Sequence, residues 1–408
     1  IIIKNLNKYK FDYISISLIF FFYFYLVSLG LFTSENSFLK NFAYIRFIIL
    51  AVAIMFLINS DNNKKFIYYL ILISLGFISM DAIYQSIFGH NLFGFEKNIE
   101  RRLTGIFDDE EVLGSFLSKF FLLCAIIFCS FRKSKFENFL FYFFSLIILI
   151  TVYLSAERLA IFAITIFLGS FLLLQFKKNI HKFYFLILST LILVTFINTS
   201  EHLKINVLAK TLSQIGFNKI SYYIVKNSST YNEWETYIQR YQEYDELIDI
   251  TPQNFINDKF GILGSSKNIY DAHYKTAKNI WKDNYWFGAG VKSFSKNCSN
   301  VKYELIDHPY NKVKCTTHPH NIYFQILSEI GLVGFILFSL IIIYIIFKNL
   351  KNIFESNKNI LSMLGLIIIF LPLPSGNFFS TWYGSILWIF LGLNFKNFLF
   401  KKPQKTIE

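Results

Sequence analysis

A histidine at the start of an apolar segment opens the part of the sequence that is richest in chemical groups. Behind His320, four polar side chains interrupt the apolar run: Asn321, Gln325, Ser328 and Glu329. Their spacing of i, i+4, i+7 and i+8 predicts a single polar face on a helix. Because polar groups are costly in lipid, this face is expected to point into a helix bundle or a water-filled cavity.

The position of His320 favours proton transfer. The start of a helix carries partial positive charge and free N–H donors, which attract anions such as phosphate and lower the pKa of a nearby histidine. A neutral imidazole can accept a proton, as a general base must. Two alternatives remain: His318 and His320 are interfacial loop residues, or the His-x-His pair binds a metal. No convincing third ligand accompanies the pair, so the sequence predicts no metal site.

Three arginines beside apolar runs are candidates to bind an anion. Arg158 stands between two such runs, where an unpaired guanidinium is costly and an anionic partner is expected. An ion pair with Glu157 or a contact with a lipid headgroup is the alternative. Arg101 and Arg102 precede another run. The acids at 108–111 that follow could bind a divalent cation, although capping of the next helix is the simpler interpretation.

The elements that position these groups are predicted to be membrane helices. The chain of 408 residues is 54% hydrophobic and only 16% charged, which is typical of a membrane protein rather than a soluble domain. Its apolar runs are roughly 16 to 22 residues long, close to the ~20 that cross the hydrocarbon layer as a helix. The sequence therefore predicts an all-α polytopic membrane protein with about ten spans: 12–32, 42–58, 66–88, 113–131, 138–155, 158–176, 182–199, 321–347, 359–374 and 378–396.

Basic residues at alternate ends of the spans predict the orientation. Pairs such as Lys64 with Lys65 and Lys401 with Lys402 fall on one side, and the short connections on the other side hold few cations. By the positive-inside rule, both termini are cytoplasmic and the polar segment 200–320 lies outside. The net charge of +13 is assigned to this topology, and no nucleic-acid motif or partner is predicted.

The spans divide the chain into three parts. Residues 1–199 form an N-terminal bundle of seven helices, 200–320 a large outer loop, and 321–408 a C-terminal bundle of three helices with a cytoplasmic tail. Aromatic residues throughout the loop indicate an ordered structure, and an oxidising outer compartment would let Cys298 and Cys315 form a disulfide. Two free thiols are the alternative. The first apolar run is long and directly followed by further spans, so no cleavable signal peptide is predicted.

Several short elements together resemble the O-antigen ligase/polymerase family of bacterial inner-membrane glycosyltransferases. The resemblance runs from about residue 100 to the C-terminus, with the elements in the family's order: Arg102-Leu103-Thr104-Gly105-Ile106-Phe107, Ser155-Ala156-Glu157-Arg158, Gly288-x-Gly290 with Phe294, His320-Asn321 with Gly331-x-x-Gly334, and Pro374-Ser375-Gly376-Asn377-Phe378-Phe379. In addition, Gly331 and Gly334 are expected to let neighbouring helices approach closely.

The resemblance implies a GT-C-like architecture and an inverting transfer of a glycan from a polyprenyl-pyrophosphate donor. The acceptor would be a hydroxyl of another glycan or of a lipid core, and the site would lie at the periplasmic face of the inner membrane. His320 would be the general base, while Arg158 and Arg102, or Arg101, would bind the pyrophosphate. No cofactor is implied, because pyrophosphate is already a good leaving group. Supporting positions would be Asn321, Gln325, Glu329, Gly331, Gly334, Gly288, Gly290, His318 and His273.

The sequence departs from the family pattern at three places. Glu157 stands where relatives have a small or hydroxyl residue, and Glu111 stands near the position of their Asn. No arginine aligns in the outer loop before the Gly-x-Gly element. His273, Lys275 or Arg240 are the candidates to replace that cation.

The acceptor class and one different function stay open. A polymerase joins one lipid-linked repeat to another, whereas a ligase transfers the glycan to a lipid core, and both fit the motifs. A transporter or flippase of lipid-linked sugars is the alternative from another class. It predicts internal repeats and polar residues near the bilayer midplane, whereas the polar clusters of this sequence gather at one face.

Overall fold

The computed structural model describes the two helical parts of the chain and the C-terminal end of the long polar segment. The described residues are 12–33, 37–58, 60–96, 103–108, 110–131, 133–175, 269–306, 308, 310–350, 353, 356–371 and 376–399, with isolated residues between 176 and 268. Within these ranges the secondary structure is helical, apart from a single β-bridge between His90 and Glu96. The predicted all-α class is confirmed for the described residues.

The helices follow the apolar runs closely. The first group is α1 (Tyr13–Thr33), α2 (Ser37–Phe42), α3 (Ile45–Leu57), α4 (Asp61–Phe88), α5 (Leu113–Phe128), α6 (Lys135–Leu154) and α7 (Arg158–Gln175). The second group is α14 (Ile269–Asp283), α15 (Phe294–Asn297), α16 (Ile322–Leu350), α17 (Asn357–Ile369) and α18 (Thr381–Leu399). Short 3-10 turns lie at Gly105–Phe107, Val301–Tyr303 and Asn311–Val313.

Five of the described helical stretches are long and apolar enough to cross a membrane: α1, Phe38–Leu57, α4, α6 and α16. The apolar helices α5, α7 and α17 are shorter. Each predicted span overlaps one of these helices or α18, except 182–199, of which the structure describes only Leu191 and Thr195. The polytopic membrane character is thus confirmed, while the count of ten spans and the placement of the whole 200–320 segment stay predictions.

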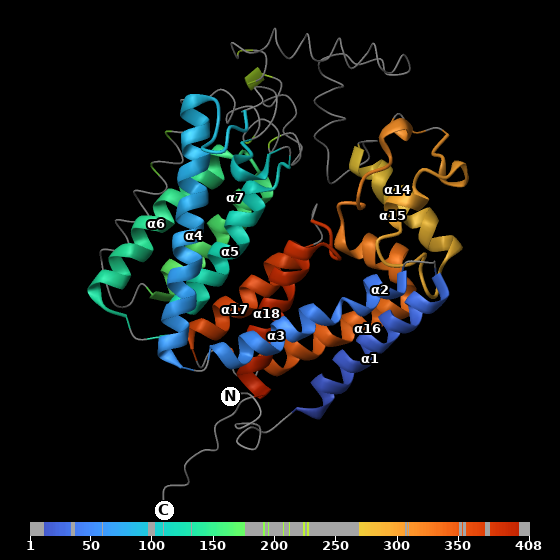
Figure 1. The fold of residues 1–408 in the computed structure, drawn as a ribbon, viewed down its shortest axis with the longest axis horizontal. Coiled ribbons are helices and arrows are strands. Elements are labelled where there is room, and N and C mark those ends of the chain that lie inside the picture. Colours follow the sequence, from blue (N-terminus) through green and yellow to red (C-terminus); the bar gives the residue numbers. More distant parts are fainter. Residues whose placement is uncertain are drawn as a thin grey trace, which may run out of the picture.

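The helices form a bundle in which α17 and α18 join two groups (Figure 1). On one side, α4 packs against α5 and α6, and α5 packs against α7; on the other, α1 packs along α16 and α3 along α18. Glycine makes the last of these contacts possible, because a Cβ at Gly392 would lie 2.6 Å from the carbonyl oxygen of Ala51. Phenylalanine fills much of the core, and the rings of Phe128 and Phe141 stack at 4.1 Å.

Successive helices bring the sequence elements to one end of the bundle. At the opposite end, the Lys65 ammonium pairs with the Glu137 carboxylate at 2.8 Å. At the first end, Gly105 lies beside α4 and the start of α5, and Gly114 of α5 meets Glu157 before α7. We call this first end, where α5, α7, α16 and α18 begin and α4, α6 and α17 finish, the motif end. All of the family-like elements that the structure describes lie there, as the predicted topology requires.

Candidate active site

The helix that follows His320 is broken at Gly331. This residue has φ 67° and ψ −174°, a conformation that only glycine adopts readily, so α16 consists of two helical segments. A break leaves backbone groups without partners inside the helix, which is tolerated at membrane depth only where other protein groups satisfy them.

The backbone of the loop after α14 forms hydrogen bonds with the groups left without helical partners at this break. The amides of Ala289 and Gly290 each donate at 2.9 Å, to the carbonyls of Ser328 and Glu329 respectively. In the other direction, the freed amides beyond the break donate to loop carbonyls: Leu332 to Tyr285 at 2.9 Å, and Val333 to Trp286 at 3.1 Å. The α16 helix and the loop are therefore joined by a short ladder of hydrogen bonds.

Two glycines make this ladder possible. Gly288, with φ 72°, lies against Gly331, and a Cβ on either residue would collide with the backbone of the other segment. The hydroxyl of Tyr25 completes the junction by donating to the carbonyl of Ile330 at 2.6 Å. The sequence predicted that Gly331 would allow close helix packing; instead, it breaks the helix so that a loop can dock. At Gly334, the nearest atoms to an added Cβ belong to Ile330 of the same helix.

Glu329 holds the same loop with its side chain. Its buried carboxylate accepts a bond of 2.8 Å from the amide of Lys292 and one of 3.4 Å from the amide of Phe294. Burying the two loop amides or the carboxylate without a hydrogen-bond partner would be costly. The amides and the carboxylate avoid this cost by bonding to each other. Glu329 thus acts as an anchor for residues 291–294 rather than as an exposed acid.

Gln325 fixes a third segment to the polar face of α16. Its amide nitrogen donates to the Asn377 side chain at 2.7 Å, and its carbonyl oxygen accepts from the Phe378 amide at 2.9 Å. Gln325, Ser328 and Glu329 are fully buried, as expected for a polar face that points into the protein. The segment that begins at Gly376 is therefore docked on the helix that carries His320.

His320 lies in a cluster of rings just before α16. Its ring centroid is 4.3 Å from that of His318, 5.4 Å from His273 and 5.7 Å from Tyr270. The backbone of His320 has φ 55°, an uncommon conformation for histidine that turns the chain into the helix. The Nδ1 atom of His273 lies 2.9 Å from the carbonyl of Lys314, which can only accept, so this nitrogen carries the proton.

The surroundings of His320 keep its imidazole neutral. Burial lowers its pKa from the ordinary 6.5 to about 3, and the neighbouring His318 and His273 act in the same direction. Burial also lowers the pKa of His273, although the bond to the Lys314 carbonyl opposes this effect. His320 and His273 are therefore neutral at pH 7, and each keeps a ring nitrogen that can accept a proton.

The cap of α16 differs from the expectation of free N–H donors. The Asn321 side chain accepts from the amides of Tyr323 and Phe324 at 3.0 and 3.3 Å, which makes it an N-cap. These two amides are occupied by the cap and do not face an anion. The low pKa of His320 arises chiefly from burial rather than from free donors of the helix start.

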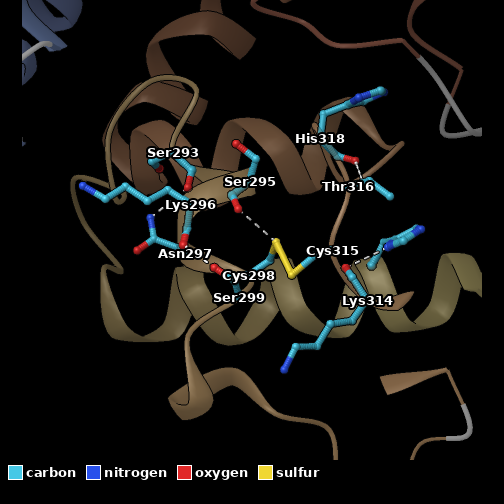
Figure 2. Close-up of a disulfide and its surroundings, with 11 residues drawn as sticks. Ser293, Ser295, Lys296, Asn297, Cys298, Ser299, Lys314, Cys315, Thr316 and His318 are labelled. Carbon is cyan, nitrogen blue, oxygen red and sulfur yellow. Dashed lines mark hydrogen bonds between the residues drawn. A yellow bond between two sulfur atoms is a disulfide. The ribbon is translucent and has the colours of Figure 1, made fainter. Parts of the chain in front are cut away.

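A disulfide fixes the chain next to the histidine cluster. Cys298 and Cys315 are bonded, with their Cα atoms 5.3 Å apart (Figure 2). Both cysteines pack with Ala277 and Phe294. On the loop-entropy model, closing a loop of this length stabilises the fold by about 3 kcal/mol. The bond fixes the segment from Lys314 to His318. It therefore also fixes the Lys314 carbonyl, which orients the His273 ring.

The cations proposed to replace the family's loop arginine lie in different environments. Lys275 pairs with the Asp271 carboxylate at 2.6 Å, and His308 lies 2.9 Å from the same group. His273 contacts His320, as described above. Arg240 lies outside the described residues.

Glu157 has a structural role that explains its departure from the family pattern. Its two carboxylate oxygens accept from the amides of Gly114 and Ser115 at 2.7 and 2.9 Å, in the first turn of α5. The sequence predicted that the acids at 108–111 would cap this helix. Instead, a carboxylate from the turn before α7 occupies these amides, because the chain brings that turn to the motif end.

The candidate arginines are on a different element from the histidine cluster or lie outside the described residues. Arg158 begins α7, whereas the histidine cluster is built by α14 and the residues before α16. Arg101 and Arg102 are not among the described residues. The segment that follows them is fixed, since the Gly105 amide donates to Gln85 at 2.7 Å and the Gly105 carbonyl accepts from Asn91 at 2.9 Å.

The segment 376–383 connects the two regions. At its start, Asn377 and Phe378 bind Gln325 of α16. At its end, the ring of Trp382 lies 6.3 Å from that of Phe116 in α5. The sequence reasoning did not identify Tyr270, Lys314 or Trp382 as parts of the site, because tertiary packing alone brings them to it.

No group of three or more His, Cys, Asp or Glu side chains is arranged to hold a metal ion among the residues that the structure describes.

These features define a polytopic all-α membrane protein with a cluster of histidines and buried polar side chains at the motif end of its bundle. Residues 143–339, a little under half of the chain, match the family model of the O-antigen ligases, which confirms the resemblance drawn from the motifs. The matched region includes Arg158, Gly288, Gly290, His320 and Gly331, whereas the elements at 102–107 and 374–379 lie outside it. No curated protein matches the chain.

Proposed function

We propose that the protein is a glycosyltransferase that moves a glycan from a polyprenyl-pyrophosphate donor to an acceptor hydroxyl. The glycan transfer would take place at the periplasmic face of the bacterial inner membrane, as a step of O-antigen or surface polysaccharide synthesis. The family match supports the reaction class. The observation that carries the proposal is the neutral His320 at the motif end, held in a ring cluster at the start of a broken helix.

His320 is the general base in this proposal. The acceptor oxygen attacks the anomeric carbon, its proton passes to the imidazole, and the bond from that carbon to the pyrophosphate oxygen breaks with inversion. Arg158 and Arg102, or Arg101, stabilise the charge on the departing pyrophosphate through fixed, permanently charged donors. An anionic donor close to His320 would raise its low pKa, so binding of the donor would strengthen the base.

The loop and helix around His320 position the reacting groups. Glu329, Gln325 and the paired glycines lock the loop and the 376–383 segment onto α16, and the disulfide holds the chain before His318. Rigid support of this kind favours catalysis, because small displacements of a general base reduce transfer strongly. The acceptor is a second lipid-linked glycan in a polymerase or a lipid core in a ligase.

The test is glycan transfer from a polyprenyl-pyrophosphate donor by the purified protein in detergent. We expect His320→Ala to reduce transfer by about two to four orders of magnitude, as loss of a general base does. His90→Ala is the matched control, because His90 is an exposed histidine on another loop. Full transfer by His320→Ala would refute the assigned base. Transport of lipid-linked sugars, the alternative raised by the sequence, is not favoured by the family match.

A further inference from the structure

A cleft at the motif end contains a cation that the proposed mechanism does not use. The cleft lies between α5, α7, α17 and α18. Its walls are mainly apolar, with Leu159, Phe162, Ile368 and Ile369 among them, and Lys119 lies in the lining.

Every wall of the cleft comes from the end of a helix at the motif end. Lys119 is in the second turn of α5, about 9 Å along the axis from Leu113 at ~1.5 Å per residue. Leu159 directly follows Arg158 at the start of α7, and Tyr383 is in the first turn of α18. The cleft therefore begins at the depth of Arg158 and extends toward the membrane interior.

Lys119 has aromatic neighbours but no ion pair among the described residues. Its ammonium lies 5.6 Å from the ring centre of Trp382 and 5.4 Å from that of Tyr383. The Glu157 carboxylate attracts it through space, yet both oxygens of Glu157 already accept bonds from α5 amides. A half-buried cation in this setting favours an anionic partner.

The opening of the cleft suits a lipid. Phe162 lines the cleft and is 47% exposed on the side of α7, in a helix that is apolar enough to lie in the membrane. An apolar chain could thus enter from the bilayer, while its charged head reaches the level of Lys119 and Arg158. Small side chains at Ala160 and Ala163 leave the space on the α7 wall.

We propose that this cleft binds the lipid end of a polyprenyl phosphate, with Lys119 contacting the phosphate and the apolar walls enclosing the first isoprene units. The inference deepens the proposed function and rests on it for the identity of the lipid. It adds Lys119 as a binding residue for the donor.

The test measures binding rather than transfer. Purified wild type, Lys119→Met, Lys119→Arg and Lys133→Met would be titrated with undecaprenyl phosphate, and separately with phosphatidylglycerol. Methionine keeps the length and packing of the side chain without its charge. Lys133 is the control, because it also lies over an aromatic ring, Phe128, but at the opposite end of α5.

We expect Lys119→Met to weaken binding of undecaprenyl phosphate about tenfold, as loss of one charge-assisted contact does, and Lys119→Arg to restore most of it. Lys133→Met should bind like wild type. Ala163→Phe, which fills the cleft and leaves Lys119 intact, should weaken binding as well. Wild-type binding by either Lys119→Met or Ala163→Phe would overturn the proposal.

Two further arms separate this inference from the proposed function. Equal affinity for phosphatidylglycerol would mean a general lipid-phosphate site and would overturn the assignment to polyprenyl lipids. Transfer by His320→Ala is measured in parallel with the binding of undecaprenyl phosphate by Lys119→Met. If His320→Ala abolishes transfer while Lys119→Met still binds the lipid like wild type, the proposed function stands and the inference about the cleft falls.

Discussion

Gly288 and Gly331 lie back to back, each in the left-handed region of φ, and a side chain on either would enter the backbone of the other. Residues 43 positions apart in the chain thus meet where a membrane helix is broken. The Gly-x-Gly and His-Asn elements, which the sequence offers as separate motifs, are the two halves of one junction.

Substitution of these glycines should destabilise the protein. We expect Gly331→Ala and Gly288→Ala to lower the free energy of unfolding by at least about 1–2 kcal/mol, the cost of a Cβ in the left-handed region. Thermal unfolding in detergent measures this loss. Gly169→Ala in α7 is the control, because no atom lies within 4 Å of an added Cβ there. Equal melting temperatures for Gly331→Ala and Gly169→Ala would contradict the junction.

Glu329 should act through the loop that it holds. Glu329→Gln retains one acceptor oxygen but places an NH₂ group against a backbone amide, so we expect a loss of about 1–3 kcal/mol in unfolding free energy together with slower transfer. Hydrogen exchange of residues 291–294 should increase in the variant. Glu304→Gln, which changes an exposed acid between α15 and α16, should change neither property. Unaltered exchange at 291–294 would show that the carboxylate does not anchor the loop.

Reduction of the disulfide should loosen the histidine cluster without unfolding the membrane helices. We expect reductant to increase hydrogen exchange around 298–318 and to slow transfer, because the Lys314 carbonyl that orients His273 is adjacent to Cys315. The double variant Cys298→Ser/Cys315→Ser should behave like the reduced protein and respond no further to reductant. A further response of that variant would place the sensitive thiols elsewhere.

The low pKa of His320 predicts a dependence of stability on pH. Because the folded state binds this proton less readily than the unfolded chain, the stability from neutral His320 is present above about pH 6.5 and is lost as the pH falls toward 3. Melting temperatures measured across this window should fall less steeply for His320→Gln than for wild type. Parallel curves would mean that the histidine is not held neutral.

Hydropathy located the apolar helices well, because an apolar run that crosses the bilayer must match its thickness, but it did not predict the polar helices α14 and α15. The contacts that build the site were harder to foresee. From the sequence, Glu157 is expected to pair with the adjacent Arg158. In the structure, its carboxylate accepts hydrogen bonds from amides 42 and 43 residues earlier in the chain. Likewise, a glycine in a membrane helix suggests close packing, and only the loop at Gly288 shows that Gly331 is a break. The spacing of residues along the sequence does not predict contacts between such distant segments.

The repaired break in α16 makes two distant stretches of chain depend on each other during assembly. Until residues 285–290 arrive, the carbonyls of Ser328 and Glu329 and the amides of Leu332 and Val333 have no loop partners. The isolated segment would therefore form an uninterrupted helix in the bilayer, and docking of the loop would exchange one set of backbone bonds for another. Assembly of the protein would thus include a rearrangement of backbone hydrogen bonds in α16 when the loop docks.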